Sequence, residues 1–89
     1  MQVHIIIKGK VQGVSYRYYT ERAALKLRLK GTVMNLQNGD VEIYAEGEDQ
    51  VLKELIDWCW KGSPAAVVSN VVVNEVHVEK EFILFHTIY

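Results

Sequence analysis

The sequence predicts an α/β (α+β) two-layer sandwich in which two helices cover one face of a mostly antiparallel sheet. Strand-like and helix-like segments alternate in the order β-α-β-β-α-β, and one more strand-like segment follows. Each helix-like segment has a single apolar stripe, so both helices can cover the same face of one sheet. An Asn-Gly pair at residues 38–39 joins the second and third strands as a tight hairpin. Together these observations indicate the ferredoxin-like arrangement with an added C-terminal strand.

The first strand and the first helix are joined by a glycine-bearing crossing. Residues 3–7 form a nearly continuous apolar run, which is typical of a strand covered on at least one face. Residues 18–29 have helical spacing, and Gly31 is expected to end this helix. The hydroxyl of Ser15 is expected to cap the helix N-terminus. The apolar stripe of the helix is expected to contain Tyr16, Tyr18 or Tyr19, Ala23 and Leu27.

The rest of the chain completes the predicted order of elements. The expected segments are strands at residues 32–36, 41–46, 67–73 and 82–89, a tight turn at 37–40 and a helix at 48–60. Cys59 falls in the apolar stripe of the second helix, where a thiol behaves as a small inert hydrophobe. His4 stands at the start of the first strand and is expected to be structural. His77 and His86 have no acid or nucleophile at a recognisable spacing, so we expect both of these to be structural as well.

Length and charge restrict the class of protein. A chain of 89 residues, 49% of them hydrophobic, is expected to form a single domain over residues 1–89. Ten Lys and Arg residues stand against eleven Asp and Glu residues, which gives a net charge of −1. Broad binding to nucleic acid or to an anionic membrane needs a strongly basic surface. We therefore expect neither a nucleic-acid partner nor a membrane partner.

Cysteine content and the absence of targeting segments indicate the compartment. Cys59 is the single cysteine, which excludes an internal disulfide and any Cys-x-x-Cys metal or redox pair. The sequence has no secretory signal and no apolar run of about 20 residues. These features predict a soluble, cytoplasmic protein, and we expect it to be a monomer.

The crossing from Gly9 to Arg17 is the candidate binding site. A glycine-bearing turn can point consecutive backbone N–H groups into a concave anion site, and a helix N-terminus adds further free donors. The guanidinium of Arg17 offers a planar set of donors that suits a phosphate or a carboxylate. Our working hypothesis is a phosphoryl-binding cradle. Its expected members are Val11, Gln12, Gly13, Val14, Ser15, Tyr16 and Arg17.

A simpler interpretation of the same residues also exists. Glycines in a turn between a strand and a helix often serve only steric needs, and an arginine near a helix start is often a solvated surface residue. The crossing has neither the Gly-Lys-Ser/Thr ending of a Walker loop nor the Gly-x-Gly-x-x-Gly pattern of dinucleotide sites. Any anion bound here must therefore be held in another way.

Two motifs together resemble the acylphosphatase family. Residues 9–17 read Gly-Lys-Val-Gln-Gly-Val-Ser-Tyr-Arg, and residues 31–41 read Gly-Thr-Val-Met-Asn-Leu-Gln-Asn-Gly-Asp-Val. Gly47, the Gly-Ser-Pro run at residues 62–64 and the closing strand extend the likeness over essentially the whole chain.

The resemblance implies a small hydrolase that needs no metal and no other cofactor. Its substrates would be acyl phosphates, small molecules in which a carboxyl group is joined to a phosphoryl group, and its products a carboxylate and inorganic phosphate. Inorganic phosphate would also be an inhibitor. By the same resemblance, Arg17 binds the phosphoryl group and Asn35 holds the attacking water.

The residue chemistry agrees with these implied roles. An acyl phosphate already has a good leaving group, so its hydrolysis depends mostly on positioning and on neutralising charge at the phosphoryl oxygens. Because the amide of an asparagine is too weak a base to remove a proton from water, its role would be to orient the water. Three residues depart from the usual pattern of the family: Ser15 stands for glycine, Tyr16 for phenylalanine, and Thr32 for an aromatic residue.

Two other functions fit the same predicted fold. One is a regulatory domain that binds phosphate or acyl phosphates without turning them over. The other is a binder of single-stranded RNA, because RNA-recognition domains share this topology. Those domains use a strand rich in aromatic residues, whereas residues 41–45 contain only Tyr44.

Overall fold

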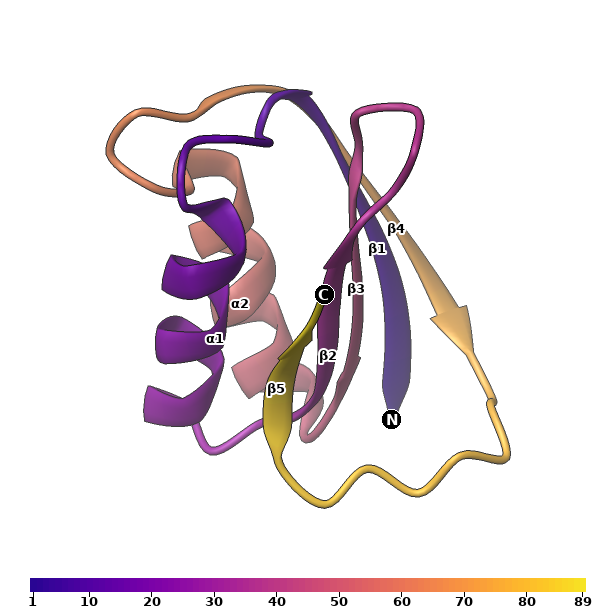
Figure 1. Ribbon diagram of the computed structural model, residues 1–89. Helices are drawn as coiled ribbons and strands as arrows, with labels where there is room; N and C mark the ends of the chain where they lie inside the picture. Colours follow the sequence, from indigo (N-terminus) through magenta and orange to yellow (C-terminus); the bar gives the residue numbers. More distant parts are fainter.

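The computed structural model describes residues 1–89 and contains one five-stranded sheet with two helices on one face (Figure 1). The elements are β1 (Gln2–Lys10), α1 (Tyr16–Lys26), β2 (Lys30–Asn35), β3 (Val41–Glu46), α2 (Asp49–Lys61), β4 (Val67–Val76) and β5 (Phe85–Ile88). The predicted order β-α-β-β-α-β with an added strand is confirmed.

The sheet has the strand order β4-β1-β3-β2-β5. Every neighbouring pair is antiparallel except β2 and β5, which run parallel. The expectation of a mostly antiparallel sheet is therefore confirmed. Figure 1 shows the crossing from β1 to α1 and the turn between β2 and β3 at the same end of the sheet.

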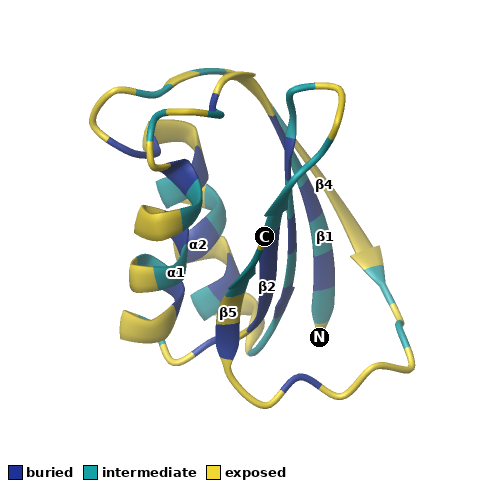
Figure 2. Ribbon diagram, viewed as in Figure 1, coloured by how far each residue is buried: buried dark blue, intermediate teal, exposed yellow.

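The core lies between the sheet and the helices. Alternate residues of β1 are buried, and each is in register with a buried residue of β3. These pairs are Val3 with Ala45, Ile5 with Ile43, and Ile7 with Val41. Figure 2 shows buried positions on the sides of both layers that face each other, so one apolar stripe per helix suffices to cover the sheet.

The first helix begins and ends earlier than the sequence predicts. It spans Tyr16–Lys26 rather than 18–29, and Leu27 is its C-cap. Arg28 takes the left-handed conformation, with φ 59°, in the turn that brings Leu29 into the core. The expected stop at Gly31 is wrong, because Gly31 lies inside β2 opposite Ala45. Only a glycine fits at this position, since the Cβ of any other residue would collide with the backbone of Tyr44.

The earlier start also changes which residues of α1 are buried. Tyr16, Thr20 and Ala24 face the core at a spacing of four residues, so Tyr16 is confirmed as a core residue. Tyr18 and Tyr19 are exposed, contrary to the expectation for that stripe. Thr20 tolerates burial because its hydroxyl donates a hydrogen bond to the carbonyl of Tyr16, at 2.8 Å.

The hairpin and the second helix agree with the sequence. The bounds of β3 are those predicted, and the turn is closed by hydrogen bonds between Leu36 and Asp40 (2.8 Å) and between Gly39 and Leu36 (3.2 Å). The buried residues of α2 include Cys59, as predicted. The last strand is shorter than expected, because Phe82 is buried in the connection that precedes it. Neither helix is long and apolar enough to span a membrane.

Two of the three departures from the family pattern have visible consequences. The hydroxyl of Tyr16 donates a hydrogen bond to the carbonyl of Cys59, at 2.8 Å. This carbonyl is in the last turn of α2, where backbone acceptors lack intrahelical partners. Thr32 faces the uncovered side of the sheet and lines a mostly apolar cavity of about 300 Å³.

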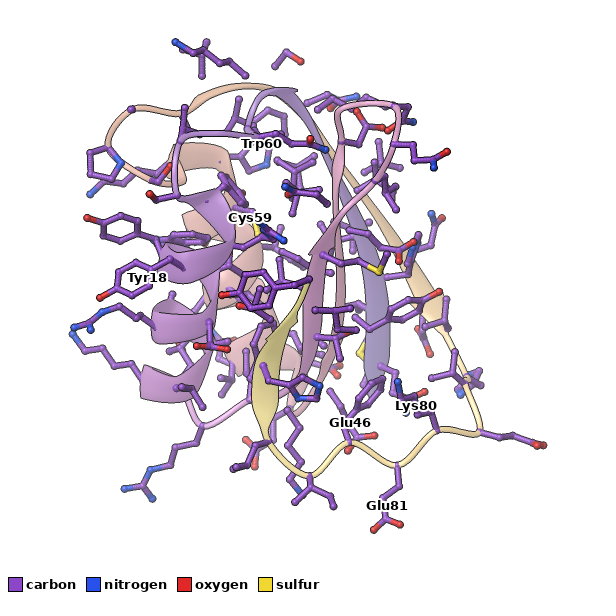
Figure 3. All side chains as sticks on the ribbon, viewed as in Figure 1. Tyr18, Glu46, Cys59, Trp60, Lys80 and Glu81 are labelled. Atoms are coloured by element: carbon purple, nitrogen blue, oxygen red, sulfur yellow. The ribbon has the colours of Figure 1, made fainter.

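The buried pair of Tyr16 and Cys59 predicts a loss of stability at alkaline pH. Cys59 lies between the helices and the sheet (Figure 3), and this burial raises its pKa from 9.0 to about 12. Burial, followed by the charge of the neighbouring thiolate, raises the pKa of Tyr16 well above its ordinary 10.0. Both groups ionise more readily in the unfolded chain, so their stabilising contribution is lost as pH rises above about 9.

Urea unfolding at about pH 8 and about pH 11 measures this loss. We expect the free energy of unfolding to fall more steeply with pH in the wild-type protein than in Cys59→Ala. Equal slopes for the two proteins would contradict the role given to the thiol.

Candidate active site

The crossing between β1 and α1 has a backbone suited to an anion. Gly13 and Ser15 both take left-handed conformations, with φ 74° and φ 61°. Left-handed residues in a turn create concave arrangements of N–H groups, and the first N–H groups of α1 have no intrahelical acceptor. Ser15 occupies the N-cap position, as predicted, but its side chain makes no capping bond. Capping requires an extended backbone, which the left-handed conformation excludes.

A cavity of about 340 Å³ opens beside this crossing, and both Arg17 and Asn35 line it. Arg17 lies in the first turn of α1, and Asn35 is the last residue of β2. The other lining residues are Val11, Gly13, Ser15, Tyr16, Tyr18 and Tyr89. The structure therefore brings together two side chains that are 18 positions apart in the sequence. Gln12 and Val14, which the sequence placed in the cradle, do not line the cavity.

The guanidinium of Arg17 is held by the end of the chain. Its Nη1 donates a hydrogen bond to the carbonyl of Ile88 at 3.3 Å, and its Cζ lies 4.9 Å from the centre of the Tyr89 ring. No carboxylate lies within ion-pair distance of Arg17. The side chain is thus oriented by neutral partners, and no carboxylate neutralises its positive charge.

The amide of Asn35 has an acceptor without a partner. Its Oδ1 is buried and makes no hydrogen bond. An unpaired buried acceptor costs about 1–3 kcal/mol, so such an atom is expected to serve a molecule that enters the site. In the hairpin, Asn35 is in register with Val41, which fixes the position of its backbone.

Two tyrosines that line the cavity were not predicted from the sequence. Tyr89 falls in the closing segment predicted as a strand, and no spacing in the sequence relates it to the crossing from Gly9 to Arg17. The sequence predicts Tyr18 or Tyr19 in the apolar stripe of the helix. Figure 3 shows the side chain of Tyr18 on the side of α1 away from the sheet, where Arg22 donates a hydrogen bond to its hydroxyl at 3.2 Å.

Comparison with known proteins identifies the family. A sequence model described as Acylphosphatase matches residues 3–87. The chain belongs to the acylphosphatase family. The acylphosphatase of Marinobacter nauticus is 49% identical to the chain over 84 residues, which are 94% of the chain and 91% of that protein. For the acylphosphatase of Shewanella amazonensis the identity is 44%, over 94% of the chain and 92% of that protein.

A solved acylphosphatase has the same fold. The crystal structure of the enzyme from Bacillus subtilis superimposes with a TM-score of 0.94 at 36% identity, covering 99% of the chain and 98% of that protein. The expected family, the ferredoxin-like fold and the expectation of an acylphosphatase enzyme are therefore confirmed. Family and fold support hydrolysis of acyl phosphates in general.

Proposed function

We propose that this acylphosphatase-family chain hydrolyses the carboxyl–phosphate bond of small acyl phosphates by direct attack of water on phosphorus. One observation carries the proposal. Arg17, whose guanidinium has no carboxylate partner, and Asn35, whose buried amide oxygen has no hydrogen-bond partner, line the same cavity. The first suits the phosphoryl dianion, and the second suits the water that attacks it.

Arg17 and the backbone of residues 11–17 bind the phosphoryl group in this proposal. The guanidinium can give two parallel N–H donors to phosphoryl oxygens, and the concave backbone supplies further donors. Because phosphoryl transfer spreads negative charge over the equatorial oxygens, these fixed donors stabilise the transition state.

Asn35 orients the attacking water. Its Oδ1 accepts one O–H of the water, which turns the oxygen lone pair towards phosphorus on the side opposite the leaving group. The water oxygen bonds to phosphorus while the bond from phosphorus to the acyl oxygen breaks, and the carboxylate leaves with the electron pair. The second proton of the water passes to a phosphoryl oxygen. The products are then a carboxylate and dihydrogen phosphate, and no strong general acid is needed.

Hydrolysis of benzoyl phosphate in the presence of EDTA tests this function. We expect turnover well above the uncatalysed rate, unchanged by the chelator. A folded protein that binds phosphate but shows no turnover at millimolar substrate would contradict the proposal. That result would instead favour the non-catalytic regulatory domain, the alternative function of the same fold.

Two further properties belong to the same proposal. Inorganic phosphate, as the product, competes with the substrate for the cradle and inhibits the enzyme. The chain works as a monomer with a single domain, because every residue assigned to the site comes from the crossing, the first turn of α1 and the end of β2 of one chain. Initial rates at increasing concentrations of phosphate and of substrate test the inhibition. Light scattering of the protein in solution tests the monomeric state.

A further inference from the structure

The side chain of Gln12 connects the crossing to the hairpin that carries Asn35. Its Nε2 donates hydrogen bonds to the carbonyl of Leu36 at 2.7 Å and to the carbonyl of Asp40 at 2.8 Å. Both hydrogens of the amide nitrogen are thereby used. Leu36 directly follows Asn35, and Asp40 directly precedes Val41, the register partner of Asn35. Gln12 therefore contacts both ends of the turn between β2 and β3, beside Asn35.

The backbone provides no such connection at this point. The pairing of β1 with β3 ends at Ile7 and Val41, whereas β1 continues to Lys10 along β4 only. β2, which carries Asn35, is not a neighbour of β1 in the sheet. The crossing that bears the cradle thus leaves the sheet next to β4, and the side chain of Gln12 spans from it to the hairpin.

We propose that the Gln12 side chain is a positioning residue that fixes the phosphoryl-binding crossing relative to Asn35. The inference rests on the proposed function, and it assigns to Gln12 a task separate from phosphate binding, because its side chain does not line the cavity. Phosphate binding uses Arg17 and the backbone of residues 11–17, and these donors all belong to the crossing and the start of α1. A shift of the crossing relative to the hairpin therefore keeps the phosphate donors together. The alignment of the water with the bound phosphoryl group depends on where the crossing lies relative to the hairpin that carries Asn35. The side chain of Gln12 joins these two segments.

Lys8 offers a matched control for this role. Its Nζ also bonds the hairpin, to the Asp40 carboxylate at 2.8 Å, but the lysine side chain is 48% exposed. Exposed ion pairs hold their partners weakly. The contact is to a side chain at the turn rather than to the backbone beside Asn35. We therefore expect Lys8→Met to leave kcat and the phosphate inhibition constant unchanged.

Gln12→Met removes both hydrogen bonds while keeping a side chain of similar length. We expect kcat for benzoyl phosphate to fall about 10- to 100-fold, as for other misplacements near 1 Å, with an unchanged phosphate inhibition constant. Unchanged kcat, or equal losses in turnover and in phosphate binding, would overturn the proposal. An inactive wild-type protein would contradict the proposed function itself, which separates the two failures.

Gln12→Glu provides a readout that a merely structural role would not change. A carboxylate has no donor for the two carbonyls, whereas the protonated acid has one. Contact with two carbonyl oxygens favours the protonated form and raises the pKa of the new carboxyl above its usual value of about 4.3. The ratio of variant to wild-type kcat should therefore rise as pH falls from about 8 to about 4. A flat ratio in a folded variant would overturn the proposal.

Discussion

Replacing Arg17 with glutamine is expected to lower the turnover of benzoyl phosphate by about 10²–10³-fold, the usual cost of losing one preorganised donor. The same change should weaken phosphate binding about 10- to 100-fold, since a hydrogen bond to a charged group contributes about 1.5–3 kcal/mol. Steady-state kinetics measure the first effect. The second is measured by the thermal unfolding midpoint, which phosphate should raise in the wild-type protein but much less in Arg17→Gln.

Arg22→Gln is the control for charge. It removes the same positive charge from α1, but Arg22 contacts Tyr18 and does not line the cavity. Its turnover and its response to phosphate should match those of the wild-type protein. If Arg17→Gln kept its phosphate response, the phosphoryl group would have to be bound elsewhere.

Asn35→Ala is expected to separate catalysis from binding. Loss of the Oδ1 acceptor leaves the water without orientation, which should reduce kcat by about 10²-fold or more. Phosphate should still raise the unfolding midpoint, because the guanidinium of Arg17 and the cradle are unchanged. Asn38→Ala is the matched control, since Asn38 lies at the exposed turn and bonds only Asp40. Near-normal turnover in Asn35→Ala would exclude a role in positioning water.

Local patterns predicted most of the fold. Three of these patterns involve residues close in the sequence: the alternation of apolar and polar residues over β3, the Asn-Gly turn and the apolar stripe of α2. Each of them is present in the structure. The bounds of α1 depend instead on tertiary packing. The chain leaves the helix at Leu27 so that Leu29 can enter the core, and Arg28 accepts a left-handed conformation as a result.

The site was predictable where a motif marks it and not where the fold alone creates it. Arg17 and Asn35 stand in two motifs, and the sheet brings them to one cavity. The contact of Arg17 with Ile88 and Tyr89 depends on the parallel pairing of β2 with β5, which no turn or spacing encodes. The bonds of Gln12 to the hairpin likewise join segments more than 20 positions apart, so only the structure reveals them.

Hydrolysis of benzoyl phosphate by the wild-type protein in water enriched in ¹⁸O tests the central claim most directly. If a water beside Asn35 attacks the phosphorus atom held by Arg17, the label enters inorganic phosphate and the benzoate remains unlabelled. Mass spectrometry of the two products distinguishes these positions. Label in the benzoate would mean that water attacks the acyl carbon, and it would contradict the mechanism built on this cavity.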